Sequence, residues 1–174
     1  MREHLQTPDR ILIVDDEPPA VMNLAHVCRK EGYEVTTRTS GAGALEALEN
    51  ERFDLVLTDL RMEKVDGMAV LRRARKLDPD QVVILITGFA TLDSAIEAMK
   101  AGAYHYIAKP FRLDEVREVI AKALELVRLR RENRDLKQKL AGGGSGASII
   151  TQDAGMQRLL DMAEQIAIAD TNVL

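Results

Sequence analysis

The sequence has 174 residues, enough for one ordinary domain with an extension or for two small domains. It is 46% hydrophobic and 30% charged, which excludes a disordered tail, and its net charge of −4 argues against nucleic-acid binding through bulk positive charge. Its single cysteine, Cys28, excludes an intrachain disulfide, and no apolar run approaches the roughly 20 residues of a membrane helix. We therefore expect a protein of the cytoplasm that does not enter a membrane.

Short apolar runs alternate with helical patterns from the start of the chain. ILIV at 11–14 predicts a buried strand, and the prolines that follow suit the first turn of a helix ending near Gly32. YEVTTR at 33–38 is more polar, which predicts an edge strand. A short helix is expected over 42–50.

The same unit then repeats. DLVLT at 54–58 predicts a third strand, and a helix is expected from Asp66-Gly67 to about Leu77. VVILIT at 82–87 is the most apolar run of the chain and predicts the central strand of a sheet.

One further helix and strand complete the alternation. The helix is capped by Thr91 or Asp93, ends at Gly102, and carries Ala95, Ile96 and Met99. YHYIAK at 104–109 predicts the fifth strand. Strands that alternate with helices predict an α/β fold, a doubly wound parallel sheet covered on both faces.

In such a fold the ligand site lies at the carboxyl ends of the strands. The polar residues at those positions are Asp15, Asp16, Asp59, Thr87 and Lys109. Three carboxylates at one edge repel each other, and oxygen ligands without histidine or cysteine suit Mg²⁺ or Mn²⁺. A lysine and a hydroxyl group suit a phosphoryl group, and one aspartate has the chemistry to accept it covalently.

Residues 10–125 resemble a bacterial response-regulator receiver domain. The resemblance rests on five elements in register: Asp15-Asp16, Asp59, Thr87-Gly88, Tyr106 and Lys109-Pro110-Phe111. It implies a flavodoxin-like, five-stranded sheet of order 2-1-3-4-5. It also implies that Asp59 is the phospho-acceptor, which receives a phosphoryl group from a sensor histidine kinase.

The resemblance implies a metal site as well. Asp16, Asp59 and the backbone carbonyl of Arg61 would bind Mg²⁺ directly, and Asp15 would act largely through water. One departure from many relatives is Glu63, which stands where they carry proline. This departure leaves the loop geometry and the phosphate lifetime open.

The remaining implied roles concern the response to phosphate. Thr87 would hydrogen-bond the phosphoryl oxygens, and Lys109 would pair with them. Tyr106 would move inward together with Thr87 as a switch. The peptide bond before Pro110 is expected to be cis.

A long helix is expected from Leu113 to Leu140, because no helix breaker interrupts it. Its first half can pack on the receiver. Its second half has apolar residues and one asparagine at a spacing of 3, 4, 3, 4, a pattern typical of parallel coiled-coil dimers. The expected dimer seam is Leu126, Leu129, Asn133, Leu136 and Leu140. Pairs of Glu125 with Arg130 and of Glu132 with Lys137 would attract across the dimer. The alternative is a solvated amphipathic helix.

These patterns predict five regions. A flexible terminus (1–9) precedes the receiver (10–125) and a dimerisation helix (126–141), and a glycine-rich linker (142–147), native or inserted, follows. Residues 148–174 resemble the start of the AAA+ ATPase domain of sigma-54-dependent transcription activators. No G-x-x-x-x-G-K-[ST] motif occurs, so we expect no ATPase site in this sequence.

The expected function is therefore a phosphorylation-dependent homodimer that controls a downstream ATPase. ATP, sigma-54 RNA polymerase and DNA would bind regions outside this sequence, and phosphorylation would either relieve repression or build the active assembly. Its own enzymatic activity would be at most phosphotransfer to Asp59 and dephosphorylation. Three alternatives remain: a phosphatase, for which Asp59-Leu60-Arg61 lacks the second acid; a dimerisation module that is never phosphorylated; and a flavin or nucleotide binder.

Overall fold

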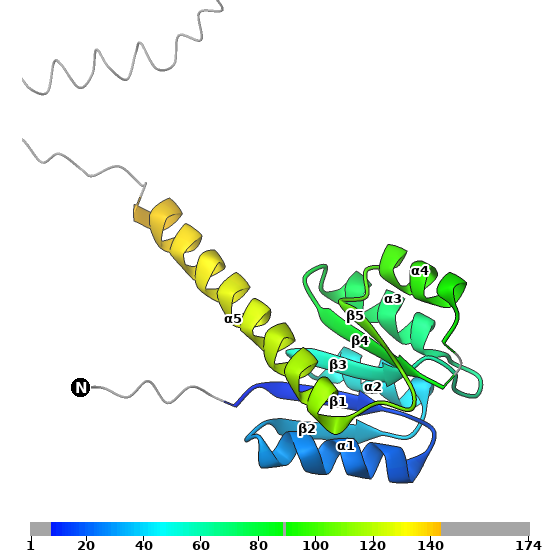
Figure 1. The fold of residues 1–174 in the computed structure, drawn as a ribbon. Coiled ribbons are helices and arrows are strands. Elements are labelled where there is room, and N and C mark those ends of the chain that lie inside the picture. The colour runs from blue at the N-terminus through cyan, green and yellow to red at the C-terminus, as the bar shows by residue number, and fades with distance from the viewer. Residues whose placement is uncertain (1–7, 89, 144–174) are drawn as a thin grey trace, which may run out of the picture. The chain divides into compact units, whose positions relative to one another are not determined.

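The computed structural model describes residues 8–88 and 90–143, and in this part of the chain five strands alternate with five helices (Figure 1). In chain order they are β1 (Arg10–Val14), α1 (Pro18–Lys30), β2 (Glu34–Arg38), α2 (Gly41–Asn50), β3 (Leu55–Asp59), α3 (Gly67–Leu77), β4 (Val82–Thr87), α4 (Leu92–Lys100), β5 (His105–Ala108) and α5 (Leu113–Gly143). Residues up to Arg131 form one unit that contains the whole sheet. A second unit begins at Glu132, and its described part is the end of α5.

The sheet is parallel throughout and has the order β2-β1-β3-β4-β5. This order confirms the predicted doubly wound fold, and β2 is an edge strand as its polar sequence indicated. The prediction that 82–87 is the central strand was wrong, because β3 lies at the centre and β4 beside the other edge. All six residues of β4 are nevertheless buried, because helices cover both faces of the sheet. The apolar sequence of a strand therefore indicates that both of its faces are covered, and it does not indicate which position the strand has in the sheet.

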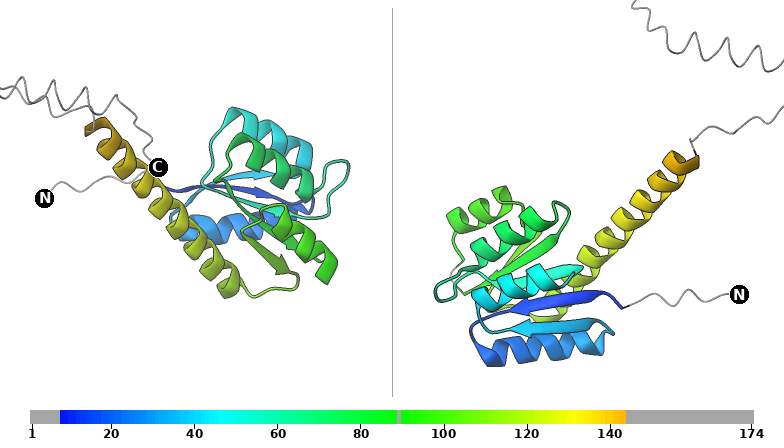
Figure 2. Two further views of the ribbon diagram at one scale, coloured as in Figure 1. Left: turned by 90° about the horizontal axis from the view of Figure 1, so that it is seen from above. Right: turned by 180° about the vertical axis from the view of Figure 1, so that it is seen from behind.

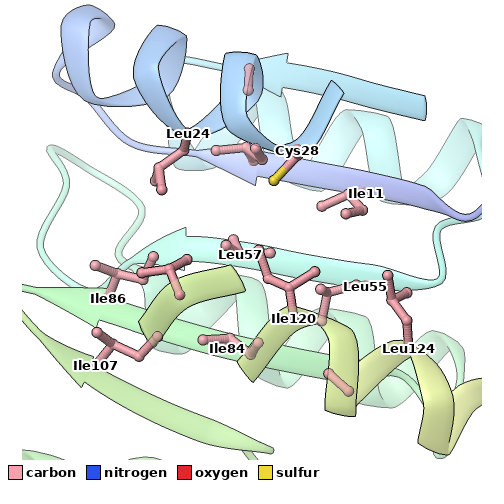
Figure 3. Packing of buried hydrophobic residues seen from close by; sticks show 14 of the residues in the cluster. Ile11, Leu24, Cys28, Leu55, Leu57, Ile84, Ile86, Ile107, Ile120 and Leu124 are labelled. Atoms are coloured by element: carbon pink, nitrogen blue, oxygen red, sulfur yellow. The ribbon is translucent and has the colours of Figure 1, made fainter. Parts of the chain in front are cut away.

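Helices lie on both faces of the sheet (Figures 1 and 2), and an apolar layer on each face holds them there. Alternate strand residues such as Ile11, Leu55 and Ile84 pack with α1 and α5, and Figure 3 shows this layer. Their neighbours, such as Leu12 and Val56, point to the other face and pack with α2, α3 and α4. This alternation follows from the two-residue period of a strand.

Local signals at the helix ends agree with the predictions. Pro18 opens α1, and Gly32 follows its end with φ of 88°. Gly102 follows α4 in the same way, with φ of 94°. The side chain of Thr91 caps α4 by accepting a hydrogen bond from Ser94 N at 3.1 Å, so the cap is Thr91 and not Asp93.

The apolar residues of α4 are placed differently from those of the other helices. Ile96 and Met99 are 43% and 49% exposed, Leu92 is 77% exposed, and Ala98 is the buried residue of this helix. The first part of α5, in contrast, packs on the sheet as predicted. Its fully buried residues are Val116, Ile120, Ala123 and Leu124.

The end of α5 modifies one predicted boundary. The helix continues to Gly143, so it includes the first two residues of the predicted 142–147 linker. The rest of that linker, the segment 148–174 and residues 1–7 lie outside the described residues. Among the helices of the described ranges, none combines the length and the apolar character needed to cross a membrane.

Candidate functional site

The parallel sheet brings the predicted site residues to one edge. Asp15 follows β1, Asp59 ends β3, Thr87 ends β4 and Lys109 follows β5. Because these strands are neighbours in the order β1-β3-β4-β5, their carboxyl ends meet there. Asp15, Asp59 and Thr87 are buried, whereas Asp16 is exposed.

Lys109 joins the two buried carboxylates. Its Nζ donates a hydrogen bond to Asp15 Oδ2 at 2.7 Å and lies 3.0 Å from Asp59 Oδ1. The side chains of Asp15 and Asp59 are only 3% and 7% exposed, compared with 24% for Lys109. A single ammonium thus pairs with two carboxylates that water hardly reaches, and the group keeps one net negative charge.

The ionisation of this group follows from the same geometry. Burial raises the pKa of Asp59 above its ordinary value, although the hydrogen bond from Lys109 acts in the opposite direction. Burial would lower the pKa of Lys109, but its hydrogen bonds to Asp15 and Asp59 outweigh this effect and raise it. Lys109 is therefore a cation at neutral pH, and the Asp59 carboxyl group lies in a poorly solvated position.

The second oxygen of Asp59 is held by the chain that follows it. Arg61 N donates to Asp59 Oδ2 at 2.6 Å, and Gly67 N donates to Leu60 O at 2.9 Å. A Cβ atom at Gly67 would lie 2.1 Å from Asp59 O, so only glycine permits this approach. The β3–α3 loop is therefore folded back against the end of β3, where it fixes the Asp59 carboxylate.

The departure at Glu63 lies in this loop. Val65 N donates to Glu63 O at 2.7 Å, and Lys64 between them has φ of 64°. Lys64 thus occupies the left-handed region that a residue other than glycine seldom adopts. Glu63 and Lys64 also line a hollow of about 360 Å³ together with Asp16, Thr39 and Ser40, so both charges border the acidic site.

The predicted switch residues are tied to neighbouring elements. The carbonyl of Thr87 accepts a hydrogen bond from Lys109 N at 2.7 Å, and the Lys109–Pro110 peptide bond is cis. The hydroxyl of Tyr106 lies 2.9 Å from Ser94 Oγ in the first turn of α4. Tyr106 therefore links β5 directly to α4.

Sequence reasoning missed Ser94 and Gly67. The spacing of Thr91 and Ser94 has the form of a capping box, but nothing in it indicates a hydrogen bond to Tyr106. The Asp66-Gly67 pair predicted a helix start, and Asp66 does cap α3 through Ala69 N at 2.8 Å. That Gly67 also contacts Asp59 became visible only in the three-dimensional structure.

The residues of the edge fit a hard divalent cation. Within 8–88 and 90–143 no three histidine, cysteine or acidic side chains converge as a ready-made metal cluster. Asp59 ends β3 and Asp16 lies shortly after β1, so both carboxylates belong to the carboxyl ends of the strands. A small number of carboxylates is compatible with Mg²⁺, which usually keeps several of its own water ligands.

Comparison with known proteins agrees with this geometry. The model of the response regulator receiver domain matches residues 11–121. The chain belongs to this family. Receiver domains are phosphorylation-dependent modules of two-component systems, and in this receiver Asp15, Asp59 and Thr87 are buried at the carboxyl ends of the strands.

Relatives and solved structures extend the comparison. The C4-dicarboxylate transport transcriptional regulatory protein DctD of Rhizobium meliloti is 33% identical over 94% of this chain, which spans only 36% of that protein. A CheY-like receiver domain from Methanospirillum hungatei is 33% identical, with a TM-score of 0.69, covering 71% of this chain and 99% of that one. The response regulator TrrA of Thermotoga maritima, solved with Mg²⁺ and beryllium fluoride, is 35% identical, with a TM-score of 0.61, over 66% of this chain and 98% of its own.

Proposed function

We propose that this receiver is a phosphorylation switch in which Asp59 accepts a phosphoryl group from a histidine kinase. The observation that carries the proposal is the position of Lys109 between the buried carboxylates of Asp15 and Asp59. In the reaction, a carboxylate oxygen of Asp59 attacks phosphorus and the P–N bond of the phosphohistidine breaks. An acyl phosphate forms on Asp59, and the histidine leaves and takes up a proton.

Each neighbour of Asp59 has a task in this step. Lys109 balances the negative charge that the phosphoryl oxygens bring into a poorly solvated position. The amide of Arg61 holds one carboxylate oxygen and so orients the other. Thr87, at the end of β4, is the proposed hydrogen-bond donor to the phosphoryl oxygens.

We propose Mg²⁺, or Mn²⁺, as the cation of this site. Asp16, Asp59 and the Arg61 carbonyl would hold it, with Asp15 acting largely through water. The bound ion would neutralise charge on the oxygens during transfer. The similarity to the Mg²⁺ complex of TrrA supports this assignment.

The response to phosphorylation would pass through Thr87 and Tyr106 to α4. Tyr106 is hydrogen-bonded to Ser94, so an inward movement of its ring breaks that bond and releases the first turn of α4. The elements affected are then α4, β5 and the start of α5. This is the face where α4 exposes its apolar side chains.

In a longer protein the switch would act on regions beyond the receiver. We propose that 10–125 is the receiver, that 126–141 is a dimerisation helix followed by the linker at 142–147, and that 148–174 begins an AAA+ domain of a sigma-54-dependent activator. The similarity to a transcriptional regulatory protein of which this chain spans only 36% supports this reading. ATP, sigma-54 RNA polymerase and DNA would be partners of those further regions.

Beryllium fluoride, a mimic of the phosphoryl group, tests the switch without a kinase. In the presence of Mg²⁺ we expect it to shift the amide NMR signals of Thr87, Tyr106 and Ser94 in the wild-type chain but not in Asp59→Asn. Asp135→Asn, which changes an exposed aspartate on α5, should respond like the wild type. No shift in the wild type would favour a dimerisation module that is never phosphorylated.

A further inference from the structure

The amino ends of the strands, opposite the proposed phosphotransfer site, carry two buried carboxylates that the proposed phosphotransfer does not use. Asp9 precedes β1 and Asp54 precedes β3, and they are 8% and 7% exposed. Each of these strands thus has an acidic residue at both ends. Along β3, Asp54 and Asp59 are about 16 Å apart at 3.3 Å per residue, so the two edges are separate sites.

Arginines of α5 pair with these carboxylates. Arg128 forms an ion pair with Asp9, and Arg131 forms one with Asp54. Arg130 donates a hydrogen bond to the backbone carbonyl of Asp80, just before β4, at 3.2 Å. One short stretch of α5 is therefore joined to the residues that precede three neighbouring strands.

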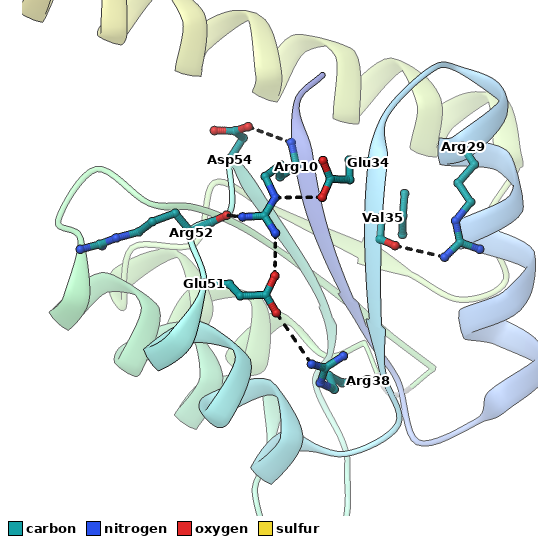
Figure 4. Close-up of polar contacts among 8 residues, drawn as sticks. All are labelled: Arg10, Arg29, Glu34, Val35, Arg38, Glu51, Arg52 and Asp54. Atoms are coloured by element: carbon teal, nitrogen blue, oxygen red, sulfur yellow. Dashed lines mark hydrogen bonds and ion pairs between the residues drawn. The ribbon is translucent and has the colours of Figure 1, made fainter. Parts of the chain in front are cut away.

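The start of β1 also holds the Asp54 side chain in place. Arg10 N donates to Asp54 Oδ2 at 2.8 Å, so the carboxylate cannot move without disturbing the strand pair (Figure 4). The guanidinium of Arg10 in turn binds Glu34 at 3.2 Å and Glu51 at 2.6 Å. Asp54 therefore presents a rigid acceptor to Arg131.

These arginines lie on the same side of α5 as its buried residues, although the side chains of both are 56% exposed. Ile120 and Leu124 are buried in the core, Val127 is partly buried against it, and Arg128 and Arg131 follow on the same side of the helix. Along this side of α5, arginines replace apolar residues where the helix passes the amino ends of the strands. Because a buried carboxylate is costly without a partner, the two pairs favour one position of the helix over others.

The apolar positions Leu126 and Leu129 lie on the other side of this stretch. At about 100° per residue, each lies roughly 200° from the arginine two positions later, Arg128 or Arg131. Leu129 is 57% exposed and Leu126 is half-buried. They are the first two positions of the predicted dimer seam. Oppositely charged Glu125 and Arg130 flank them, and Arg130 is the residue that also bonds the Asp80 carbonyl.

We propose that Asp9 and Asp54 are an anchor for α5 that turns Leu126 and Leu129 away from the sheet, where a second copy of this chain pairs with them. The pairing rests on the dimer proposed above but not on phosphoryl transfer. Arg128 and Arg131 are positioning residues in this account. They determine which face of α5 is left for the partner while the opposite face is held by the receiver.

Disulfide trapping tests the orientation of the seam in the full chain. Leu129→Cys is introduced in a Cys28→Ala background, and the yield of interchain disulfide is measured under mild oxidation. We expect a high yield, a drop of about fivefold or more when Arg128→Gln and Arg131→Gln are added, and recovery with lysine at both positions. Lys122→Gln, which removes an exposed charge of α5 that pairs with Glu118, should leave the yield unchanged.

Hydrogen exchange distinguishes the two parts of the proposal. With both arginines replaced by glutamine, amides 124–131 should exchange about tenfold faster or more, while amides of β3 stay protected and show that the fold is intact. Unchanged exchange at 124–131, or an unchanged disulfide yield, would overturn the anchor. No disulfide in any variant, with the exchange effect present, would instead overturn pairing with a second copy and the proposed dimer.

Discussion

The ammonium of Lys109 lies 2.7 Å from Oδ2 of Asp15, a residue 94 positions earlier in the chain. The same ammonium lies 3.0 Å from Asp59 Oδ1, so one cation is paired with both buried carboxylates. Two consequences follow. Removing the lysine should destabilise the fold, and a divalent cation at the same carboxylates should compensate for part of that loss.

Lys109→Gln tests these consequences. We expect the free energy of unfolding to fall by about 1–3 kcal/mol in the presence of a chelator, because two buried carboxylates lose their cation. The loss should shrink in saturating Mg²⁺. Urea unfolding under both conditions measures it, and Lys122→Gln is the control, since its pair with Glu118 is exposed. An equal loss with and without Mg²⁺ would contradict metal binding at these carboxylates.

Gly67→Ala tests the contact between the β3–α3 loop and Asp59. The added methyl would meet Asp59 O at 2.1 Å, so the loop must shift, and we expect a loss of about 1–3 kcal/mol in the free energy of unfolding. Gly88→Ala is the matched control, because nothing lies within 4 Å of a Cβ there, and it should change stability by less than about 0.5 kcal/mol. Similar values for the two variants in urea unfolding would refute the close approach.

Tyr106→Phe tests the link between β5 and α4. Losing the hydrogen bond to Ser94 should cost about 0.5–1.5 kcal/mol and should accelerate hydrogen exchange of the α4 amides at 92–100. Tyr104→Phe is the control, since Tyr104 packs in the layer beneath α1 and α5. If the α4 amides exchange equally in both variants, Tyr106 does not hold α4.

Cys28 gives a pH dependence with a defined sign. Burial raises the pKa of this thiol to about 11, whereas an unfolded cysteine has a pKa of about 8.5. The folded state holds the proton more tightly, so this contribution to stability is complete below about pH 8.5 and is lost as the pH rises toward 11. Urea unfolding between these values should show a steeper decline for the wild type than for Cys28→Ala. Parallel declines would contradict the burial effect.

The sequence was sufficient to predict that charged side chains meet at the carboxyl ends of the strands. Parallel strands that alternate with helices must place their carboxyl ends together, so Asp15, Asp59 and Lys109 were expected to meet, and they do. The position of β4 was misjudged because an apolar strand indicates that helices cover both of its faces. It does not indicate that the strand is the central one of the sheet. The exposure of Ile96 and Met99 on α4 was not predicted either, because a helical pattern does not show whether a face is covered.

The side-chain contacts of α4 and α5 were beyond prediction for a physical reason. The Tyr106–Ser94 bond depends on how α4 lies on the sheet, and the pairs of Arg128 and Arg131 depend on where a long helix crosses the ends of the strands. The helix expected over 113–140 includes these arginines, but the sequence could not show that they pair with Asp9 and Asp54. Sequence periodicity predicts which residues share a face of a helix. Which residues that face contacts depends on the three-dimensional fold.

Intact mass after incubation with acetyl phosphate and Mg²⁺ is the most direct test of the central claim, that Asp59 accepts a phosphoryl group. Wild type and Asp59→Asn are compared, with Asp135→Asn as a second control. The account predicts one phosphoryl adduct on the wild type and on Asp135→Asn, and none on Asp59→Asn. An unmodified wild type under conditions that label another receiver, or an adduct that persists in Asp59→Asn, would contradict it.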